Sequence, residues 1–230
     1  MPWPLPDRCV LGMFARRPDP GAVKTRLAAA LGDEGAAAAH EAMALDLAEL
    51  WGSDAVLAPG GRRALAFAPV DAGPWFDERV PAAWSLVPQG PGDLGARMRA
   101  FFDDEFADGA ERVVLIGSDA PTLDPSTIVS AFLCLEGRDL VLGPAADGGY
   151  YLVGCRGSTA PIFEGVDWGT ADVLSQTIDR LEGSSTSLSV LPPWWDVDRP
   201  EDWRSLRGHV RALRRAGVDP RLPRVEALLK

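Results

Sequence analysis

The chain has 230 residues, 47% of them hydrophobic and 24% charged, which is enough for one large α/β domain with a full core or, at most, two small ones. Its formal net charge of -10 and its pI of about 4.7 argue against a nucleic-acid backbone or an anionic membrane as partner. Three cysteines without CxxC spacing, no signal-peptide pattern and no apolar run of about 18 residues predict a protein of the reducing cytoplasm.

The first predicted strand, 9–15, runs into a stiff turn that contains two prolines and Gly21. Lys24-Thr25-Arg26 then opens a predicted helix over 23–31. A strand, a basic glycine-containing loop and a helix N-terminus together form a cradle for phosphate, because backbone N–H groups and the helix dipole attract anions. The spacing fits neither GxxxxGK[ST] nor GxGxxG, and a solvated basic turn is the alternative interpretation.

The next segments continue the alternation of helices and strands. An alanine-rich amphipathic pattern predicts a helix over 33–51, in which Asp46 lies mid-helix and is interpreted as structural. Strands are predicted at 64–68 and 84–87. A glycine-rich loop, 89–95, then leads into a helix at 96–106 whose Met and Phe face is interpreted as core.

The segment that contains Asp119 organises the rest of the chain. Residues 113–116 form a β-branched apolar run, which is typical of a strand buried on both faces. Gly117-Ser118 frees the chain to turn, and Asp119 follows at the strand end. The carboxyl ends of strands in an open α/β sheet are where ligands bind. Alone, Asp119 would be interpreted as a turn cap, but the other strand ends favour a site.

The second half of the chain repeats the pattern and predicts one α/β domain over 1–213. We expect a Rossmann-like, three-layer fold with a mostly parallel, mixed central sheet, followed by a peripheral C-terminal tail, 214–230. Two glycines, Gly148 and Gly149, suggest backbone that approaches something closely. The predicted elements are helix 127–135, strands 140–142 and 150–154, helix 171–181, strand 188–191 and helix 200–213.

Charged side chains gather at three strand ends: Arg16, Lys24 and Arg26; Asp119; and Asp196 with Asp198. If residues 196–198 are extended, Asp196 and Asp198 share one face about 7 Å apart. Carboxylate oxygens suit Mg²⁺ or Mn²⁺, and one or two such ions would bind the phosphates of a nucleotide. Three acids that face each other repel, so their convergence would require a cation.

Four segments form a pattern that extends from about residue 9 to residue 203: Lys24-Thr25-Arg26-Leu27, Met43-x-x-Asp46, Asp119-x-Pro121 and Asp196-Val197-Asp198-x-Pro200-Glu201-Asp202. This pattern resembles the GT-A-fold nucleotide transferases, specifically the phospholactate and phosphoenolpyruvate guanylyltransferases and, more distantly, the molybdenum-cofactor nucleotidyltransferase. A closer resemblance is to a bacterial branch called glycosyltransferase-like and linked to arsenosugar synthesis. That branch shares basic-x-Pro-x-Pro-Gly-x-x-Lys-Thr-Arg-Leu, Gln-Gly-x-Gly-Asp-Leu-Gly-x-Arg-Met, Ile-Gly-x-Asp-x-Pro and Asp-Gly-Gly-Tyr.

The resemblance implies a GT-A-type mixed sheet with a nucleotide at the strand ends, Lys24 and Arg26 on its phosphates and the aspartates on the metals. Two departures are visible. The guanylyltransferases have Gly-Thr-Asn near the acid substrate, whereas Asp147-Gly148-Gly149-Tyr150 stands here, so the acceptor should differ. Arg16 replaces the usual lysine of the branch, which keeps the charge but offers a planar fork.

The first hypothesis is a metal-dependent nucleotidyltransferase that moves a nucleotidyl group from a nucleoside triphosphate to a small anionic acceptor and releases pyrophosphate. The second is a glycosyltransferase that uses a nucleotide sugar, and the third is a non-catalytic nucleotide-binding protein. A homodimer is compatible with the sequence, which fixes neither nucleobase nor acceptor. The expected catalytic residues are Lys24, Arg26 and Asp119; the metal ligands are Asp119, Asp196 and Asp198; and the substrate-binding residues are Arg16, Gly21, Thr25, Gln89, Gly90, Asp93, Asp147, Gly148, Gly149 and Tyr150.

Overall fold

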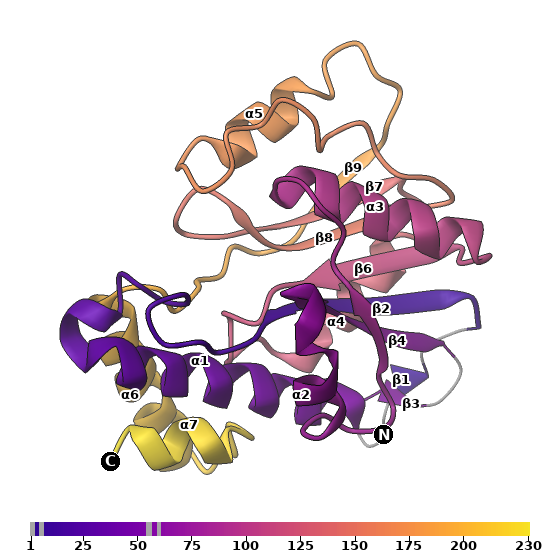
Figure 1. The fold of residues 1–230 in the computed structure, drawn as a ribbon. Coiled ribbons are helices and arrows are strands. Elements are labelled where there is room, and N and C mark those ends of the chain that lie inside the picture. The colour runs from indigo at the N-terminus through magenta and orange to yellow at the C-terminus, as the bar shows by residue number, and fades with distance from the viewer. Residues whose placement is uncertain (1–2, 5–6, 54–56, 59–60) are drawn as a thin grey trace.

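The fold is built on a seven-stranded mixed sheet, and the computed structural model describes residues 3–4, 7–53, 57–58 and 61–230 (Figure 1). Strand β8 is antiparallel to both of its neighbours, whereas the remaining pairs are parallel. A separate parallel pair joins β1 (Trp3–Pro4) and β3 (Leu57–Ala58). In sheet order the strands are β5 (Ser85–Pro88), β4 (Arg62–Ala68), β2 (Cys9–Arg16), β6 (Arg112–Ile116), β8 (Tyr150–Arg156), β7 (Leu140–Pro144) and β9 (Leu188–Val190).

Helices cover both faces of this sheet, which gives three layers (Figure 1). Leu11 and Met13 of β2 belong to the core beneath α1 and α4, whereas Val10, one residue out of phase, packs with α3 on the other face. The helices are α1 (Ala28–Gly52), α2 (Gly73–Asp77), α3 (Leu94–Ala107), α4 (Pro125–Cys134), α5 (Val173–Asp179), α6 (Pro200–Arg215) and α7 (Pro223–Leu228), with a 3₁₀ turn at Val70–Ala72.

The close approach of α3 depends on Gly12. A Cβ atom at this position would lie 2.5 Å from the Phe101 ring of α3, which is closer than carbon atoms can pack. The missing side chain therefore lets α3 settle directly over the middle of β2.

The sheet has its switch point between β2 and β6. From β2 the chain crosses through α1 to β4 on one side, whereas β6 adjoins β8 on the other side. Ligands of open α/β sheets bind outside the carboxyl ends of such strands. Because β8 runs antiparallel, its first residue, Tyr150, also lies at this edge.

The predicted fold class is confirmed, and each predicted strand corresponds to an observed one. The helix predicted over 23–31 is wrong in its first half, because α1 begins only at Ala28 and is interrupted at Gly32 (φ 71°, ψ 168°). Lys24 instead has a left-handed backbone (φ 47°). Its buried ion pairs decide the conformation of this segment, and they outweigh local helix preference.

Residues 195–198 belong to no strand of the sheet. Their alternation nevertheless holds, because Val197 is fully buried while Asp196 and Asp198 line a cavity. Asp196 and Asp198 therefore lie on the same side of the segment, as the sequence predicts, although the segment is not part of the sheet.

Asp46 connects α1 to α7. Its side chain is fully buried; it accepts hydrogen bonds from the main-chain N–H groups of Arg224 (3.0 Å) and Val225 (3.0 Å) and pairs with the Arg224 guanidinium at 3.0 Å. Part of the predicted peripheral tail thus packs on α1 through this carboxylate, which agrees with the structural interpretation of Asp46.

Asp46→Ala is expected to lower the free energy of unfolding by about 3 kcal/mol, because two buried N–H groups and a guanidinium lose their acceptor. Urea unfolding measures this effect, and Glu49→Ala, an exposed acid in the same helix, is the control. Nucleotide binding should be unchanged in the folded variant. A loss of nucleotide binding with intact stability would place Asp46 in the site instead.

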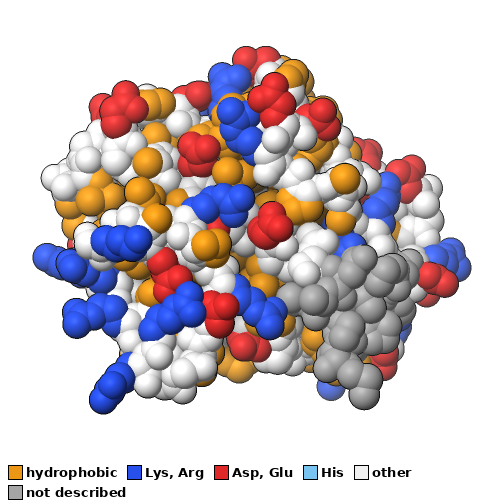
Figure 2. All heavy atoms as spheres, turned by 90° about the horizontal axis from the view of Figure 1, so that it is seen from below, with side chains coloured by type: hydrophobic (Ala, Val, Ile, Leu, Met, Phe, Trp, Pro, Cys, Tyr) orange, Lys and Arg blue, Asp and Glu red, His pale blue; other side chains and the backbone are white. Residues whose placement is uncertain are grey.

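The charge of the chain is unevenly distributed. The last 32 residues contain nine lysines and arginines but only four aspartates and glutamates, so the acidic excess lies entirely in the preceding part. Figure 2 shows basic side chains along the left margin of the face seen from below, the side on which α6 lies in Figure 1. Within the described residues, none of the helices is long and apolar enough to cross a membrane.

Candidate active site

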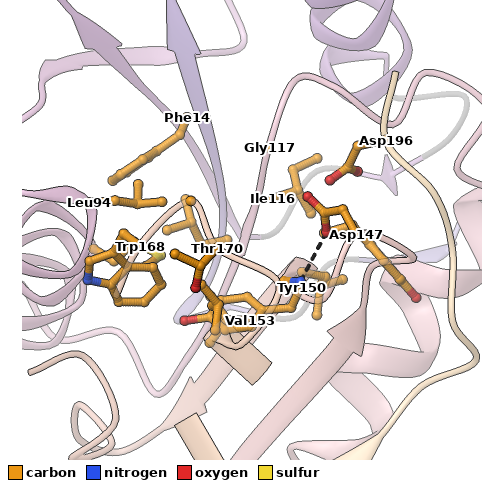
Figure 3. Close-up of a pocket in the computed structure, with 17 residues that line it drawn as sticks. Phe14, Leu94, Ile116, Gly117, Asp147, Tyr150, Val153, Trp168, Thr170 and Asp196 are labelled. Atoms are coloured by element: carbon orange, nitrogen blue, oxygen red, sulfur yellow. Dashed lines mark hydrogen bonds between the residues drawn. The ribbon is translucent and has the colours of Figure 1, made fainter. Parts of the chain in front are cut away.

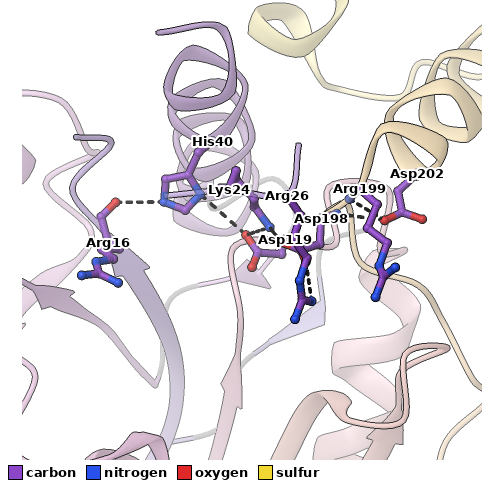
Figure 4. A network of polar contacts seen from close by, with 8 residues as sticks. All are labelled: Arg16, Lys24, Arg26, His40, Asp119, Asp198, Arg199 and Asp202. Atoms are coloured by element: carbon purple, nitrogen blue, oxygen red, sulfur yellow. Dashed lines mark hydrogen bonds and ion pairs between the residues drawn. The ribbon is translucent and has the colours of Figure 1, made fainter. Parts of the chain in front are cut away.

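Lys24 is the centre of the candidate site. The chain has only two lysines, Lys24 and Lys230, beside 21 arginines. The Lys24 side chain is 5% exposed, and its Nζ lies 2.9 Å from Asp119 Oδ1 and 3.8 Å from Asp198 Oδ1 (Figure 4). A buried ammonium is costly unless it is paired, so the two carboxylates account for its burial.

Asp119 follows β6, and its carboxylate lies near the Lys24 ammonium and the His40 imidazole. Burial of its carboxyl favours the neutral form, but the Lys24 ammonium and the His40 imidazole outweigh this and hold the pKa of Asp119 far below its usual range. His40 Nδ1 lies 3.7 Å from Asp119 Oδ1, and His40 Nε2 lies 3.0 Å from the main-chain oxygen of Arg16 (Figure 4). Asp119 is therefore an ionised carboxylate held between β2, α1 and β6.

Asp198 and Asp196 approach from the opposite side, on the segment that precedes α6. Asp198 Oδ2 accepts a hydrogen bond from Arg26 Nη1 at 3.0 Å, and the main-chain N–H of Val197 donates to Asp119 O at 2.8 Å. This second bond ties the segment directly to the end of β6. Burial, followed by the negative charges of Asp119 and Asp147, raises the pKa of Asp196 to about 7.

These groups surround one cavity, which we call the Lys24 cavity. Its described charged or imidazole-bearing lining residues are Arg16, Lys24, His40, Asp119, Asp196 and Asp198. The cavity lies at the predicted edge of the sheet, outside the ends of β2 and β6. The structure thus brings the basic loop and all three acids together at the switch point. Arg26 lies at its margin, 58% exposed, where it pairs with Asp198.

A second cavity, of about 220 Å³, adjoins the first, and we call it the Trp168 cavity. Phe14, Leu94, Tyr150 and Asp196 line both cavities. Asp147 and Trp168 line the second, and the rings of Tyr150 and Trp168 pack edge to face with their centroids 6.2 Å apart. The two cavities are therefore adjacent at the edge of the sheet, and we call them together the recess.

Gln89 and Asp93, two of the predicted substrate-binding residues, have hydrogen-bond partners within the protein. Gln89 lines the Lys24 cavity, but its Nε2 donates to Ala66 O (2.9 Å) and Ala15 O (3.3 Å). Asp93 caps α3 by accepting from Ala96 N at 2.8 Å. Neither Asp93 nor Gly90 is among the described lining residues of the two cavities. Their proposed role in binding stays a prediction.

The Asp147–Tyr150 turn lies at the far side of the recess. Asp147 Oδ1 accepts from Gly149 N at 3.0 Å, which fixes the turn. Gly148 has φ 95°, and a Cβ atom there would lie 2.1 Å from the carbonyl oxygen of Ala171. The close approach predicted for these glycines is therefore made, in the case of Gly148, to another part of this chain.

Gly21 and Thr25 are exposed in the loop that carries Lys24, and they are not among the described residues lining either cavity. Sequence reasoning missed His40 and Trp168. His40 lies in a helical pattern. The signal that could have identified it is that this helix directly follows the basic loop that contains Lys24. Trp168 follows β8 by a long irregular segment, so nothing in its spacing predicts that it returns to the strand ends.

The acids fit a divalent cation in their chemistry, since three carboxylates line one cavity and carboxylate oxygens are the ligands that Mg²⁺ and Mn²⁺ prefer. However, no three His, Cys, Asp or Glu side chains of the described residues are grouped as a ready-made metal site. The Lys24 ammonium lies between Asp119 and Asp198 and partly fills that role.

Solved structures share this fold. A "putative nucleotide-diphospho-sugar transferase" from Desulfovibrio desulfuricans G20 is 30% identical over 97% of both chains, with a TM-score of 0.82. A cytidylyltransferase from Leptospira borgpetersenii (13% identity, 96% of this chain and 94% of that chain, TM-score 0.53) shares the fold. So does 4-diphosphocytidyl-2C-methyl-D-erythritol synthase from Anaerococcus prevotii (10% identity, 89% and 96%, TM-score 0.56). No protein with a curated description matches the chain.

A bacterial protein family gives the remaining comparison. Its profile matches residues 53–170, about half of the chain, including β4 to β8 and the Asp119 and Asp147 segments. The chain therefore belongs to the family described as "uncharacterized protein conserved in bacteria (DUF2064)".

Proposed function

We propose that the protein transfers a group from a nucleotide donor to a small-molecule acceptor, and that the group is a nucleotidyl moiety taken from a nucleoside triphosphate. The observation that carries the proposal is the buried Lys24 ammonium, set between Asp119 and Asp198 at the carboxyl ends of β2 and β6. A preorganised cation at the switch point of an α/β sheet is suited to a phosphate group.

The donor phosphates would enter the Lys24 cavity. Lys24 and Arg16 are among its lining residues, and Arg26 lies at its margin, so three basic residues would be near an incoming polyphosphate. Arg26 is held by Asp198, and Lys24 by Asp119, which keeps both cations oriented before the donor arrives. Preorganised charge of this kind stabilises the negative charge that develops on a leaving group without any reorganisation during the reaction.

The proposed reaction is a displacement at the α-phosphorus. An oxygen or nitrogen of the acceptor forms a bond to that phosphorus and loses its proton to solvent. The bond between the α-phosphorus and the bridging oxygen breaks, and pyrophosphate leaves with the electron pair. Lys24 and Arg26 would stabilise the charge that accumulates on pyrophosphate.

Asp119, Asp196 and Asp198 would hold the divalent ion, Mg²⁺ or Mn²⁺, which we propose as cofactor. When bound, it would neutralise charge on the phosphates of the donor. Asp119 also pairs with Lys24, and Asp198 pairs with Arg26. These two acids would therefore orient the cations in addition to holding the metal. Asp196, which lines both cavities, would lie between the donor and the acceptor.

Glycosyl transfer from a nucleotide sugar is the second candidate, and the relative from Desulfovibrio favours it, since its name refers to that donor. The two proposals differ in the bond that breaks and hence in the product. Binding of the four nucleoside triphosphates and of nucleotide sugars should be measured with and without Mg²⁺, followed by incubation with a pool of acceptors. Pyrophosphate as product supports nucleotidyl transfer. A nucleoside diphosphate, with tight binding of nucleotide sugars alone, would replace it by glycosyl transfer.

Asp198→Asn is expected to lower turnover about tenfold while it changes the dissociation constant of the nucleotide by less than about threefold. The variant keeps the shape of the side chain but loses the charge that orients Lys24 and Arg26 during the reaction. Glu201→Gln, an exposed acid three residues further on, is the control. Equal effects on the dissociation constant and on turnover would contradict this role, because they would mean that Asp198 already contributes to binding of the nucleotide in the ground state.

A further inference from the structure

The described lining of the Trp168 cavity contains acidic side chains and no basic one. Asp147 and Asp196 line it, and none of its described lining residues is a lysine, arginine or histidine. The cations of the site belong to the Lys24 cavity, where Arg16 and Lys24 are found. The two halves of the recess therefore differ in the charge of the ligand that each can accept.

The cavity is also divided along its length (Figure 3). Phe14, Leu94 and Trp168 lie on one side, and the carboxylates of Asp147 and Asp196 lie on the other. Asp196 lines the Lys24 cavity too, as do Phe14 and Leu94, whereas Trp168 and Asp147 line the Trp168 cavity and not the Lys24 cavity. A molecule held here would present its polar group toward the donor and its apolar body toward Trp168.

An anionic polar group in this position would lie beside two carboxylates with no basic side chain of the cavity to offset them. A hydroxyl can donate a hydrogen bond to a carboxylate, and an ammonium can pair with one. Three of the lining residues, Phe14, Tyr150 and Trp168, are aromatic, and aromatic rings pack with apolar groups and attract cations rather than anions to their faces.

We propose that the Trp168 cavity binds the acceptor, and that the acceptor is an uncharged or cationic molecule, an alcohol or an amine, with an apolar body. This rests on the proposed function, which supplies the donor and the transferred group. It differs from the anionic acceptor of the first sequence hypothesis, because none of the described lining residues of the Trp168 cavity is basic.

A nucleobase is the competing occupant, since it too is flat and uncharged. In an open α/β sheet a mononucleotide lies on a βαβ unit of parallel strands, such as β2-α1-β4 here, whereas the Trp168 cavity lies beside the antiparallel strand β8. Acceptor and nucleotide should therefore bind together.

The test uses three probes with the same phenyl body and different head groups: 2-phenylethanol, 2-phenylethylamine and phenylacetate. Their binding to the full chain is measured by saturation-transfer NMR and calorimetry, in buffer and with saturating nucleoside triphosphate and Mg²⁺. We expect the alcohol and the amine to bind at least tenfold more tightly than phenylacetate, and to remain bound when the nucleotide is present. Equal or tighter binding of phenylacetate overturns the proposal, as does displacement of the probes by nucleotide.

Two pairs of variants locate the binding site. Trp168→Ala should weaken binding of the alcohol at least fivefold, whereas Trp75→Ala, which removes a partly buried indole on α2 far along the sheet, should not. Leu94→Lys should shift the preference at least tenfold toward phenylacetate. Its control is Leu133→Lys, because Leu94 and Leu133 are 44% and 49% exposed and only Leu94 lines the cavities. Equal effects within either pair overturn the assignment.

Failure of the proposed function looks different. It would appear as absence of nucleotide binding to the wild-type protein when no probe is present. The preference among the three probes is measured without turnover, so the chemistry of the cavity is tested separately.

Discussion

Lys24→Met is expected to lower turnover roughly ten- to a thousandfold, the range found when one preorganised charge or donor is removed from an active site. Methionine keeps much of the length and volume of the buried side chain, so the loss isolates the ammonium. Without it, Asp119 and Asp198 lose the cation that lies 2.9 Å and 3.8 Å from them. Steady-state kinetics and nucleotide binding measure the effect, and Lys230→Met, at the only other lysine, is the control.

The same variant has a signature in stability. A carboxylate whose pKa is lowered by folding contributes stability that is present above its unfolded pKa of about 4 and is lost as the pH falls toward the folded value. The metal-free wild type should therefore be more stable than Lys24→Met at pH 7, and this difference should shrink below about pH 4. Small and equal kinetic effects of the substitutions at Lys24 and Lys230 would contradict the catalytic role of Lys24 and favour the alternative interpretation of its loop as a solvated basic turn.

Asp119→Asn should abolish the part of nucleotide binding that depends on Mg²⁺, so that the dissociation constants measured with Mg²⁺ and with chelator become equal. It should also lower the free energy of unfolding by about 2 kcal/mol. Breaking a buried ion pair costs more, but the Asp119 side chain is 40% exposed and Asp198 remains near Lys24. The cost is larger than the sequence suggests for a carboxylate after a strand, since Asp119 is the main partner of a buried lysine.

Asp124→Asn is the matched control for Asp119→Asn. Asp124 lies five residues further on and caps α4 by accepting from Ser126 N at 2.8 Å, a role that asparagine fills equally well. Its nucleotide binding and its thermal stability should match the wild type. An Asp119→Asn protein that keeps the full Mg²⁺ response would exclude Asp119 as a metal ligand.

The sheet could be predicted because its signals are local. Short apolar runs such as Val113–Ile116 are buried on both faces, and proline and glycine mark where each strand ends. The positions of Asp119 and Lys24 at neighbouring strand ends followed from that alternation. The approach of Asp198 to Asp119 could not be predicted from local signals, because it depends on how a segment 79 residues further along the chain returns to the sheet.

What could not be predicted is long-range or conformational. The left-handed backbone of Lys24 runs against the helix propensity of its neighbours, and only its buried ion pairs explain it. Trp168 reaches the site because α3 leaves room at Gly95, where a Cβ atom would lie 2.5 Å from its indole nitrogen. Such a fit between two distant segments has no periodic pattern in the sequence.

The main-chain hydrogen bond from Val197 to Asp119 has a consequence for how the chain folds. During synthesis β2 and β6 can pair, and Asp119 can meet Lys24, before residue 197 has been made. The bond closes a loop of 78 residues, so ordering the last two acids carries a large entropic cost and comes late. Lys24 therefore serves as an internal counter-ion for Asp119 in the nascent chain, and the site reaches its final negative charge only when the C-terminal segment docks.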